Sequence, residues 1–432
     1  MKHLSLYLIV VLFALMKIEA YAQNGVWNGT LELHGVKIPL VFHFTDDGCF
    51  LDSPSQGAKG IKAECTLKDG SVDVRVPLIG ARFEGLLVGD SIKGVFRQGS
   101  LSLPLTVAKG YYKAVRPQTP SAPFPYNTEE LKFDNDGFTF GGTLTLPENY
   151  GKNTPVVLMI TGSGQQNRDE EIFGHKPFAV IADYLARRGI ASYRYDDRGF
   201  GDDSVSFVKF TTDDFMHDAA AAVAMLRKRF DKVGLLGHSE GGTIAFTLAA
   251  EGRADFVVSL AGMAVSGRET LVRQNRWALS SSGMSSDVLD SCCEAIDKAF
   301  GQMAEGKPLS EVSFDGAPPA LKPHLRRSLA QADSPYMRRF ITVDVSPLLS
   351  SVQCPVLALN GEKDIQVDCS TNLAALATGL QNCQKVIKSF AGMNHLFQSC
   401  STGSVAEYSQ IEETVSPAVL STITDWILAL GR

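Results

Sequence analysis

The chain has 432 residues, 44% of them hydrophobic, which is the apolar content of a globular protein with a sizeable core. Its 41 basic and 47 acidic residues are spread along the sequence and give a formal net charge of -6. Disorder is therefore excluded as the main state, and because no block of Lys and Arg could neutralise a row of phosphates, we do not expect nucleic acid as a partner.

Residues 1–22 are typical of a secretory signal peptide. Lys2 precedes an apolar segment from Leu4 to Met16, and Ala20-Tyr21-Ala22 fits an A-x-A cleavage site before Gln23. The apolar segment is shorter than the roughly 20 residues that a membrane anchor needs. No later run is long enough to span a bilayer, so we expect an exported protein, periplasmic or secreted, with no membrane span after cleavage.

Residues 23–112 predict a small all-β domain. Short stretches alternate polar and apolar residues, as in Val72-Asp73-Val74-Arg75-Val76, and turn signals such as Asp46-Asp47-Gly48 separate them. Four prolines then follow between Arg116 and Pro125, which excludes a regular helix or a central strand there. We interpret residues 113–128 as an extended linker.

From residue 129 to residue 432, apolar strands alternate with amphipathic helices. Continuous apolar strands with helical crossovers predict a doubly wound, mostly parallel sheet covered on both faces. The expected strands are residues 139–146, 156–161, 190–195, 233–236, 256–260, 356–359 and 385–390. The expected helices include residues 177–188, 213–230, 243–250 and 417–430.

An insertion at about residues 264–346 interrupts this alternation. It has no strand signal, but helical patterns occur around residues 269–279, 287–303 and 321–330. The economical interpretation is a helical cap over the sheet.

The pentapeptide Gly237-His238-Ser239-Glu240-Gly241 is the most informative motif. It lies between an apolar run and an expected helix, as in a nucleophile elbow, where a sharp strand-to-helix turn lifts a serine hydroxyl clear of the sheet. The pentapeptide alone is weak evidence, because a chain with 39 glycines can contain it by chance. Its position between strand and helix makes Ser239 the candidate nucleophile.

A serine nucleophile needs an imidazole base, and the imidazole needs a carboxylate. Two histidines follow Ser239, and His324 lies in the strandless insertion, so the expected base is His395, just after the last strand. Asp364 lies on the turn after the strand that precedes it, at the sheet edge where catalytic groups gather, and is the expected acid. The alternative carboxylates are Asp368 and Glu362.

The loop Thr161-Gly162-Ser163-Gly164 follows an early strand and predicts an oxyanion loop. The expected donors are the backbone N–H groups of Ser163 and Glu240. A phosphate cradle is the alternative, but the loop lacks the G-K-[ST] ending and the full G-x-G-x-x-G pattern. We expect no metal and no cofactor.

The residues beside these motifs have expected structural roles. Asp196, Asp197 and Arg198 follow a strand and are expected to brace loops, while His238 and Glu240 are expected to orient the elbow. The alternative for Glu240 is attraction of a cationic substrate group.

Eight cysteines are too sparse over this length for a small disulfide scaffold. Cys369 and Cys400 both follow loops of the expected site, which makes them a candidate pair for a bridge. Buried free thiols are the alternative.

Six segments together carry a family resemblance. They are Gly162-Ser163-Gly164 with Arg168-Asp169-Glu170, His175-Lys176-Pro177-Phe178, Tyr195-Asp196-Asp197-Arg198-Gly199, the pentapeptide with Gly242, Gly361-Glu362-Lys363-Asp364, and Asn394-His395-Leu396-Phe397. Over residues 130–430 the chain resembles the α/β-hydrolase superfamily, and within it exported bacterial esterases that join a small N-terminal β domain to a capped hydrolase domain.

The resemblance implies carboxylesterase activity with Ser239, Asp364 and His395 as the triad. The chain departs from the family in two places. Thr161 stands where a histidine usually precedes the oxyanion-loop glycine, and Asp202-Asp203 stands where a serine usually closes the Arg-Gly-x-Gly turn.

The expected function is hydrolysis of small-molecule carboxylic esters, of the short-chain or small aryl or sugar kind, through an acyl-enzyme on Ser239. A serine peptidase or amidase of the same fold is the alternative, and it would need an acidic cluster to hold a free amine. The candidates for that cluster are Glu240, Glu170 and Glu171. A catalytically inactive carbohydrate- or partner-binding protein is a third hypothesis, against which the complete triad argues.

Overall fold

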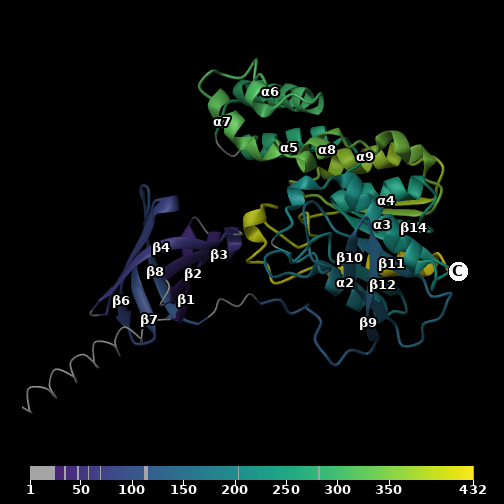
Figure 1. The fold of residues 1–432 in the computed structure, drawn as a ribbon, viewed down its shortest axis with the longest axis horizontal. Coiled ribbons are helices and arrows are strands. Elements are labelled where there is room, and N and C mark those ends of the chain that lie inside the picture. The colour runs from purple at the N-terminus through teal and green to yellow at the C-terminus, as the bar shows by residue number, and fades with distance from the viewer. Residues whose placement is uncertain are drawn as a thin grey trace, which may run out of the picture. The chain divides into compact units, whose positions relative to one another are not determined.

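The computed structural model describes residues 25–33, 36–45, 48–56, 58–68, 70–110, 115–202, 204–280 and 283–431. The expected signal peptide lies outside the described residues. The chain divides into two compact units (Figure 1). The barrel unit comprises Met1–Val115 and Val405–Glu412, and the α/β unit comprises Arg116–Ser404 and Glu413–Arg432.

The barrel unit is a closed barrel of eight strands in chain order. The strands are β1 (Gly25–Leu33), β2 (Val36–Thr45), β3 (Gly48–Ser53), β4 (Ala58–Lys68), β5 (Ser71–Val76), β6 (Ala81–Val88), β7 (Ser91–Gln98) and β8 (Leu101–Lys109). Strand β1 pairs with β8, with Trp27 opposite Lys109, and this pairing closes the barrel. Val72, Val74 and Val76 alternate into its interior, as their period of two predicts.

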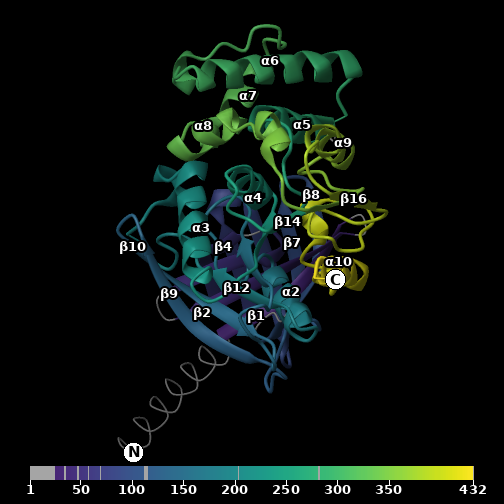
Figure 2. The ribbon, with the colours of Figure 1, turned by 90° about the vertical axis from the view of Figure 1, so that its right-hand side faces the viewer.

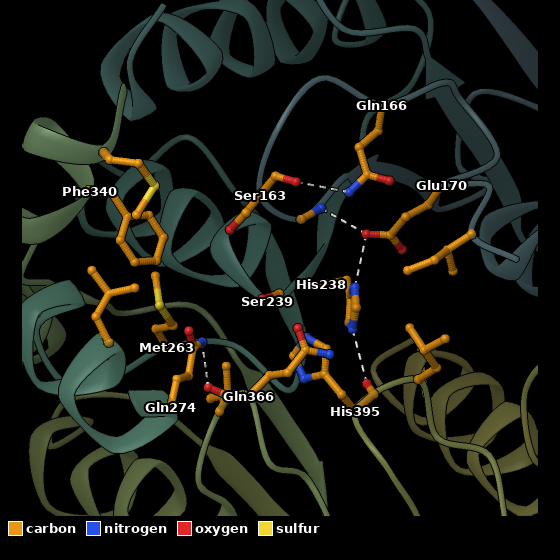
Figure 3. A pocket seen from close by; sticks show the side chains of 16 residues that line it. Ser163, Gln166, Glu170, His238, Ser239, Met263, Gln274, Phe340, Gln366 and His395 are labelled. Atoms are coloured by element: carbon orange, nitrogen blue, oxygen red, sulfur yellow. Dashed lines mark hydrogen bonds and ion pairs between the residues drawn. The ribbon is translucent and has the colours of Figure 1, made fainter. Parts of the chain in front are cut away.

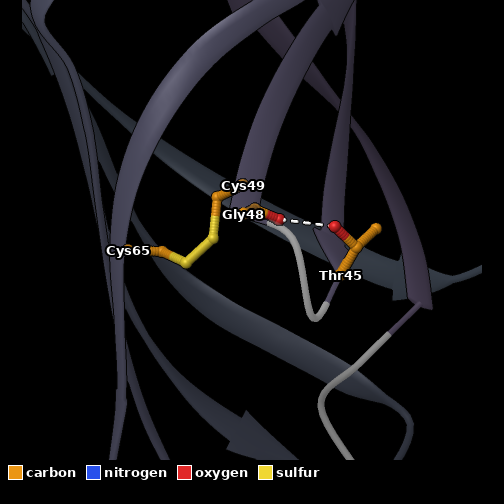
Figure 4. The surroundings of a disulfide bond; sticks show 4 residues. All are labelled: Thr45, Gly48, Cys49 and Cys65. Carbon is orange, nitrogen blue, oxygen red and sulfur yellow. Dashed lines mark hydrogen bonds between the residues drawn. A yellow bond between two sulfur atoms is a disulfide. The ribbon is translucent and has the colours of Figure 1, made fainter.

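A disulfide joins Cys49 on β3 to Cys65 on β4 (Figure 4). The two strands are antiparallel neighbours in the barrel, which brings the two cysteines together. The candidate bridge between Cys369 and Cys400 is wrong, because those two residues are not joined. The sequence could not favour Cys49 and Cys65, because their proximity depends on the strand register.

The α/β unit is built on an eight-stranded sheet in the order β16-β15-β14-β13-β11-β12-β10-β9. Its strands are β9 (Asn127–Asn135), β10 (Phe138–Leu146), β11 (Val156–Ile160), β12 (Ala191–Tyr195), β13 (Val233–His238), β14 (Phe256–Leu260), β15 (Val356–Gly361) and β16 (Lys385–Phe390). The strands from β11 to β16 run parallel, while β10 is antiparallel to β12 and to β9. The mostly parallel sheet expected from the sequence is therefore present.

Strand β9 was not expected from the sequence, which placed its first residues in the linker. Its acidic residues, Glu129 and Glu130, obscure the apolar pattern of a strand. Strand β9 forms a hairpin with β10 through Asp136 and Gly137, both at positive φ (48° and 79°). Asp-Gly is a favoured sequence for such a turn, and this signal could have revealed the strand.

Helices cover both faces of the sheet. On β11, Val156, Leu158 and Ile160 pack in one core with α3 (Thr212–Leu226), α4 (Glu240–Ala250) and α9 (Cys369–Gly379). The intervening Val157 and Met159 pack in a second core with α2 (Pro177–Ala186) and α10 (Pro417–Ala429). Burial on both faces explains why these strands read as continuous apolar runs.

Four helices lie between β14 and β15, where the sequence predicts an insertion. They are α5 (Gly267–Ser280), α6 (Ser286–Ala304), α7 (Lys322–Ser328) and α8 (Pro335–Thr342). They form a separate layer (Figure 2) with a small core of their own, which includes Ile296, Phe300 and Leu325. Helix α8 was not expected because it is short, although Ser334, whose side chain caps it, and Pro335 are typical of a helix start.

Within the described residues, no helix combines the length and the apolar character that crossing a membrane requires.

Replacing both Cys49 and Cys65 with serine should destabilise the barrel unit. The bridge spans 16 residues, and closing a loop of that size in the unfolded chain contributes about 3 kcal/mol to the free energy of unfolding. Urea unfolding of the full chain, in a Trp277→Phe/Trp426→Phe background that leaves the buried Trp27 as the fluorescent tryptophan, measures this loss. Reduction of the wild-type protein should give the same shift and Cys383→Ser should give none, whereas an unchanged midpoint in the double variant contradicts the assignment.

Candidate active site

Ser239 lies at the sharp junction between β13 and α4. Its backbone is left-handed (φ 54°, ψ -119°), a conformation that costs energy in any residue with a side chain. A Cβ on Gly237 would lie 2.0 Å from the Gly241 carbonyl oxygen, and one on Gly241 would lie 2.2 Å from the Ile160 oxygen. The glycines of the pentapeptide are therefore required because backbones meet closely on both sides of the serine.

His395 and Asp364 form a buried hydrogen-bonded pair. The His395 Nδ1 lies 2.7 Å from Asp364 Oδ2, and both side chains are buried. The other carboxylate oxygen, Oδ1, accepts the backbone N–H groups of Gln366 (2.8 Å) and Val367 (2.9 Å). Because the carboxylate fixes the proton on Nδ1, the lone pair of the ring is on Nε2, as a general base requires.

Ser239 and His395 line the same cavity (Figure 3). The two alternative carboxylates have other tasks. Asp368 caps α9 through the Thr371 N–H, and Glu362 accepts the Ser389 hydroxyl at the surface. Of the three acidic candidates, Asp364 is thus the one that contacts the histidine.

Asn394 shapes the loop that carries His395. Its Oδ1 accepts the backbone N–H groups of Leu396 and Gln398, both at 3.0 Å, and its Nδ2 donates to Gln398 Oε1. The residue is fully buried. Sequence reasoning assigned Asn394 no role, although an asparagine that bonds the backbone two residues onward is a known turn signal.

Three residues support the loop that is expected to form part of the oxyanion hole. Asp197 accepts the Thr161 hydroxyl at 3.1 Å and the Gln166 N–H at 2.7 Å, Glu170 accepts the Gly162 N–H at 2.8 Å, and the Tyr336 hydroxyl accepts the Gly164 N–H at 2.9 Å. Burial raises the pKa of Asp197 well above its ordinary value. Thr161 stands where the resembled family usually has a histidine, and its hydrogen bond to the buried Asp197 carboxyl holds the loop at that position.

Arg198 braces the neighbouring loop, as the sequence predicts. Its guanidinium is buried and donates to both carboxylate oxygens of Asp218, at 2.7 and 2.8 Å, and to Asp214. Moving any one partner away would leave a buried charge uncompensated, which is costly. The arginine and its paired carboxylates therefore hold this loop in one geometry.

Glu240 does not line the cavity, and hydroxyl groups surround its carboxylate. Thr212 donates to its Oε1 at 2.6 Å and the Tyr336 hydroxyl donates to its Oε2, and the residue is buried. Burial raises the pKa of this carboxyl above its ordinary value. These contacts agree with a role of Glu240 in orienting the elbow, and they engage both carboxylate oxygens that the alternative role would need for a cationic substrate group.

His238 lies next to His395, with the two ring centroids 4.6 Å apart. Its Nδ1 is 2.9 Å from Glu170 Oε1, and its Nε2 is 3.0 Å from the backbone carbonyl oxygen of His395 (Figure 3). Burial acts to lower the pKa of His238, but the Glu170 carboxylate outweighs it and raises that pKa above its ordinary value. Sequence reasoning had assigned Glu170 only to a hypothetical amine site.

The cavity has a volume of about 310 Å³. Much of its wall is apolar, and helices α5 and α8 contribute Leu271, Met337 and Phe340. Three glutamines, Gln166, Gln274 and Gln366, add polar groups. Glu170 is the one acidic residue among the described lining residues, and it already accepts two hydrogen bonds.

Known proteins resemble parts of this chain. Residues 176–290 match the family described as serine aminopeptidase, S33. Esterase EstD from Thermotoga maritima is 32% identical over 166 residues, 38% of this chain and 39% of that protein. The chain thus spans about two fifths of the length of this relative.

Solved structures with a similar arrangement include Est1E from Butyrivibrio proteoclasticus, which is 16% identical with a TM-score of 0.42, covering 69% of this chain and 98% of that one. A proline iminopeptidase from Mycobacterium smegmatis is 14% identical with a TM-score of 0.43, covering 70% and 98%. The sequence matches, the sheet order and the elbow at Ser239 agree with the resemblance of this chain to the α/β-hydrolase superfamily.

Proposed function

We propose that this protein hydrolyses carboxylic esters through an acyl-enzyme on Ser239. One observation carries the proposal: His395, whose Nδ1 lies 2.7 Å from Asp364 Oδ2, lines the same cavity as a serine in a strained elbow. The relative esterase EstD is 32% identical to this chain over 166 residues, which is 39% of its own length, and this similarity adds support.

In the proposed reaction, Ser239 Oγ attacks the ester carbonyl carbon while His395 Nε2 takes its proton. The carbonyl oxygen becomes an oxyanion, and the backbone N–H groups of Ser163 and Glu240 stabilise it. Glu240 is the first residue of α4, so the positive end of the helix dipole adds to this stabilisation. His395 then protonates the departing alkoxide, and afterwards deprotonates the water that releases the acid.

The helical insertion acts as a cap that shapes the acyl and alcohol pocket in this proposal. Leu271 and Gln274 of α5 and Met337 and Phe340 of α8 line the cavity. A volume of about 310 Å³ accommodates a small ester, and the apolar wall favours an uncharged group. We therefore propose neutral short-chain or small aryl or sugar esters as the substrate class.

A serine aminopeptidase is the second candidate, and the description of the matching family favours it. An aminopeptidase needs a carboxylate that faces the free amine. Glu170 is already engaged by Gly162 and His238, Glu240 is engaged by Thr212 and Tyr336, and Glu171 does not line the cavity. These contacts support the esterase.

We propose export of the mature protein, which the N-terminal sequence pattern supports. The Cys49–Cys65 bridge is consistent with an oxidising compartment.

Ser239→Ala should lower kcat for a short-chain aryl ester by at least about 10⁴-fold, because the acyl-enzyme cannot form without the hydroxyl. Steady-state kinetics with purified protein measures this loss, and circular dichroism shows that the fold is retained. Ser291→Ala on α6, outside the cavity, is the matched control and should keep full activity. Turnover retained by Ser239→Ala would sink the assignment of the nucleophile.

Neutral acetyl esters should exceed aminoacyl anilides in kcat/KM by at least about 100-fold. A protonated amine in this cavity finds no unengaged carboxylate among the described lining residues, and an unpaired buried charge is costly. A panel of both substrate types, assayed below and above the pKa of the amine, measures the preference. Preference for the free-amine substrates would establish the aminopeptidase instead.

A further inference from the structure

Both ring nitrogens of His238 face hydrogen-bond acceptors. Its Nε2 lies 3.0 Å from the backbone carbonyl oxygen of His395, which can only accept. Its Nδ1 lies 2.9 Å from Glu170 Oε1, the same oxygen that accepts the Gly162 N–H at 2.8 Å. A neutral imidazole has one N–H group, whereas an imidazolium has two. The contacts therefore match the charged form of the ring.

We propose that His238 is a positioning residue that works as an imidazolium, joined with Glu170 in a buried ion pair that ties the oxyanion loop to the backbone of the catalytic base. The inference rests on the proposed ester hydrolysis. Through Glu170 the pair holds Gly162, which precedes the expected donor Ser163. Through the His395 carbonyl it holds the loop that carries the base.

The charges around His238 favour this state. Glu170 is in direct contact, the His395 ring centroid is 4.6 Å away, and Asp364 lies beyond it and also acts to raise the pKa of His238. On its other side His238 borders a small gap that Phe178, Leu260, Leu396 and Val415 line with apolar groups. A cation in such surroundings requires a paired carboxylate.

Neighbouring residues hold the backbone of Glu170 in an uncommon conformation. Its φ is 52°, which is uncommon for a residue with a long side chain. Asn167 holds this turn, because its carbonyl oxygen accepts the Glu170 N–H and its Oδ1 accepts the N–H groups of Asp169 and Glu171. A strained turn that directs a carboxylate inward is expected where geometry serves function.

A pH dependence follows from the direction of the shift. Because the pKa of His238 is raised in the folded protein, the ion pair is complete below that pKa and is lost as the pH rises through it. Without the proton on Nδ1, a ring lone pair faces the Glu170 carboxylate, and the contact that positions both loops becomes repulsive. kcat should therefore fall on a basic limb as the pH rises through the pKa of His238.

The test is the pH profile of kcat in Glu170→Gln. Glutamine keeps an oxygen that can accept from Gly162 and His238 but removes the negative charge. The basic limb should move to lower pH by about one unit or more, because the pairing charge is gone. Glu171→Gln, its exposed neighbour paired with Lys176, is the matched control and should keep the wild-type profile. A uniform loss of kcat with unchanged limbs would overturn the proposal, because a merely structural role predicts that result.

A measurement without turnover separates this inference from the proposed function. In ¹⁵N-histidine-labelled Ser239→Ala protein at neutral pH, the His238 ring, assigned with His238→Gln, should show two protonated nitrogens. Adding Glu170→Gln should return it to the neutral form at the same pH. A neutral ring with Glu170 present contradicts the ion pair, whereas absence of ester turnover in the wild-type protein would reject only the proposed function.

Discussion

The strained backbone at Ser239 is the constraint on which the site depends. Its left-handed conformation holds only because two close contacts exclude larger side chains, one between Gly237 and Gly241 and one between Gly241 and the end of β11. The Ser239 N–H donates to the carbonyl oxygen of Leu260 at the end of β14. The two strands beside β13, which are β11 and β14, therefore both fix the turn. Sheet packing therefore compensates for a conformation that the serine alone would not adopt.

The other groups of the candidate active site lie on loops that buried polar side chains hold in place. Asp364 receives two backbone N–H groups, Asn394 organises the turn at His395, and Asp197 holds Thr161. Tyr336, from the helical insertion, contacts both Glu240 and Gly164 and so connects the insertion to the two segments of the expected oxyanion hole. Since each such group is buried, losing one partner leaves an uncompensated polar atom, and the loops are correspondingly well defined.

The motifs that can be predicted from the sequence are those that depend on residues close together in the chain. The elbow depends on glycine at fixed spacing, and the strands of the parallel sheet are apolar on both faces, so both are visible in the residue pattern. Strand β9 was hidden by its charged residues, and the Cys49–Cys65 bridge depends on a strand register that no local pattern encodes. The roles of Glu170 and Tyr336 arise from contacts with segments 68 and 96 residues away, which only the fold brings together.

Covalent labelling tests the central claim most directly. An aryl fluorophosphonate reacts with an activated serine hydroxyl and displaces fluoride, and peptide mass spectrometry locates the adduct. The account predicts a single adduct on Ser239, which forms quickly in the wild-type protein and at least about 10³-fold more slowly in Asp364→Asn, where the base loses its orienting carboxylate. Labelling at another serine, or an equal rate in Asp364→Asn, would contradict the assignment of Ser239, His395 and Asp364 as one catalytic unit.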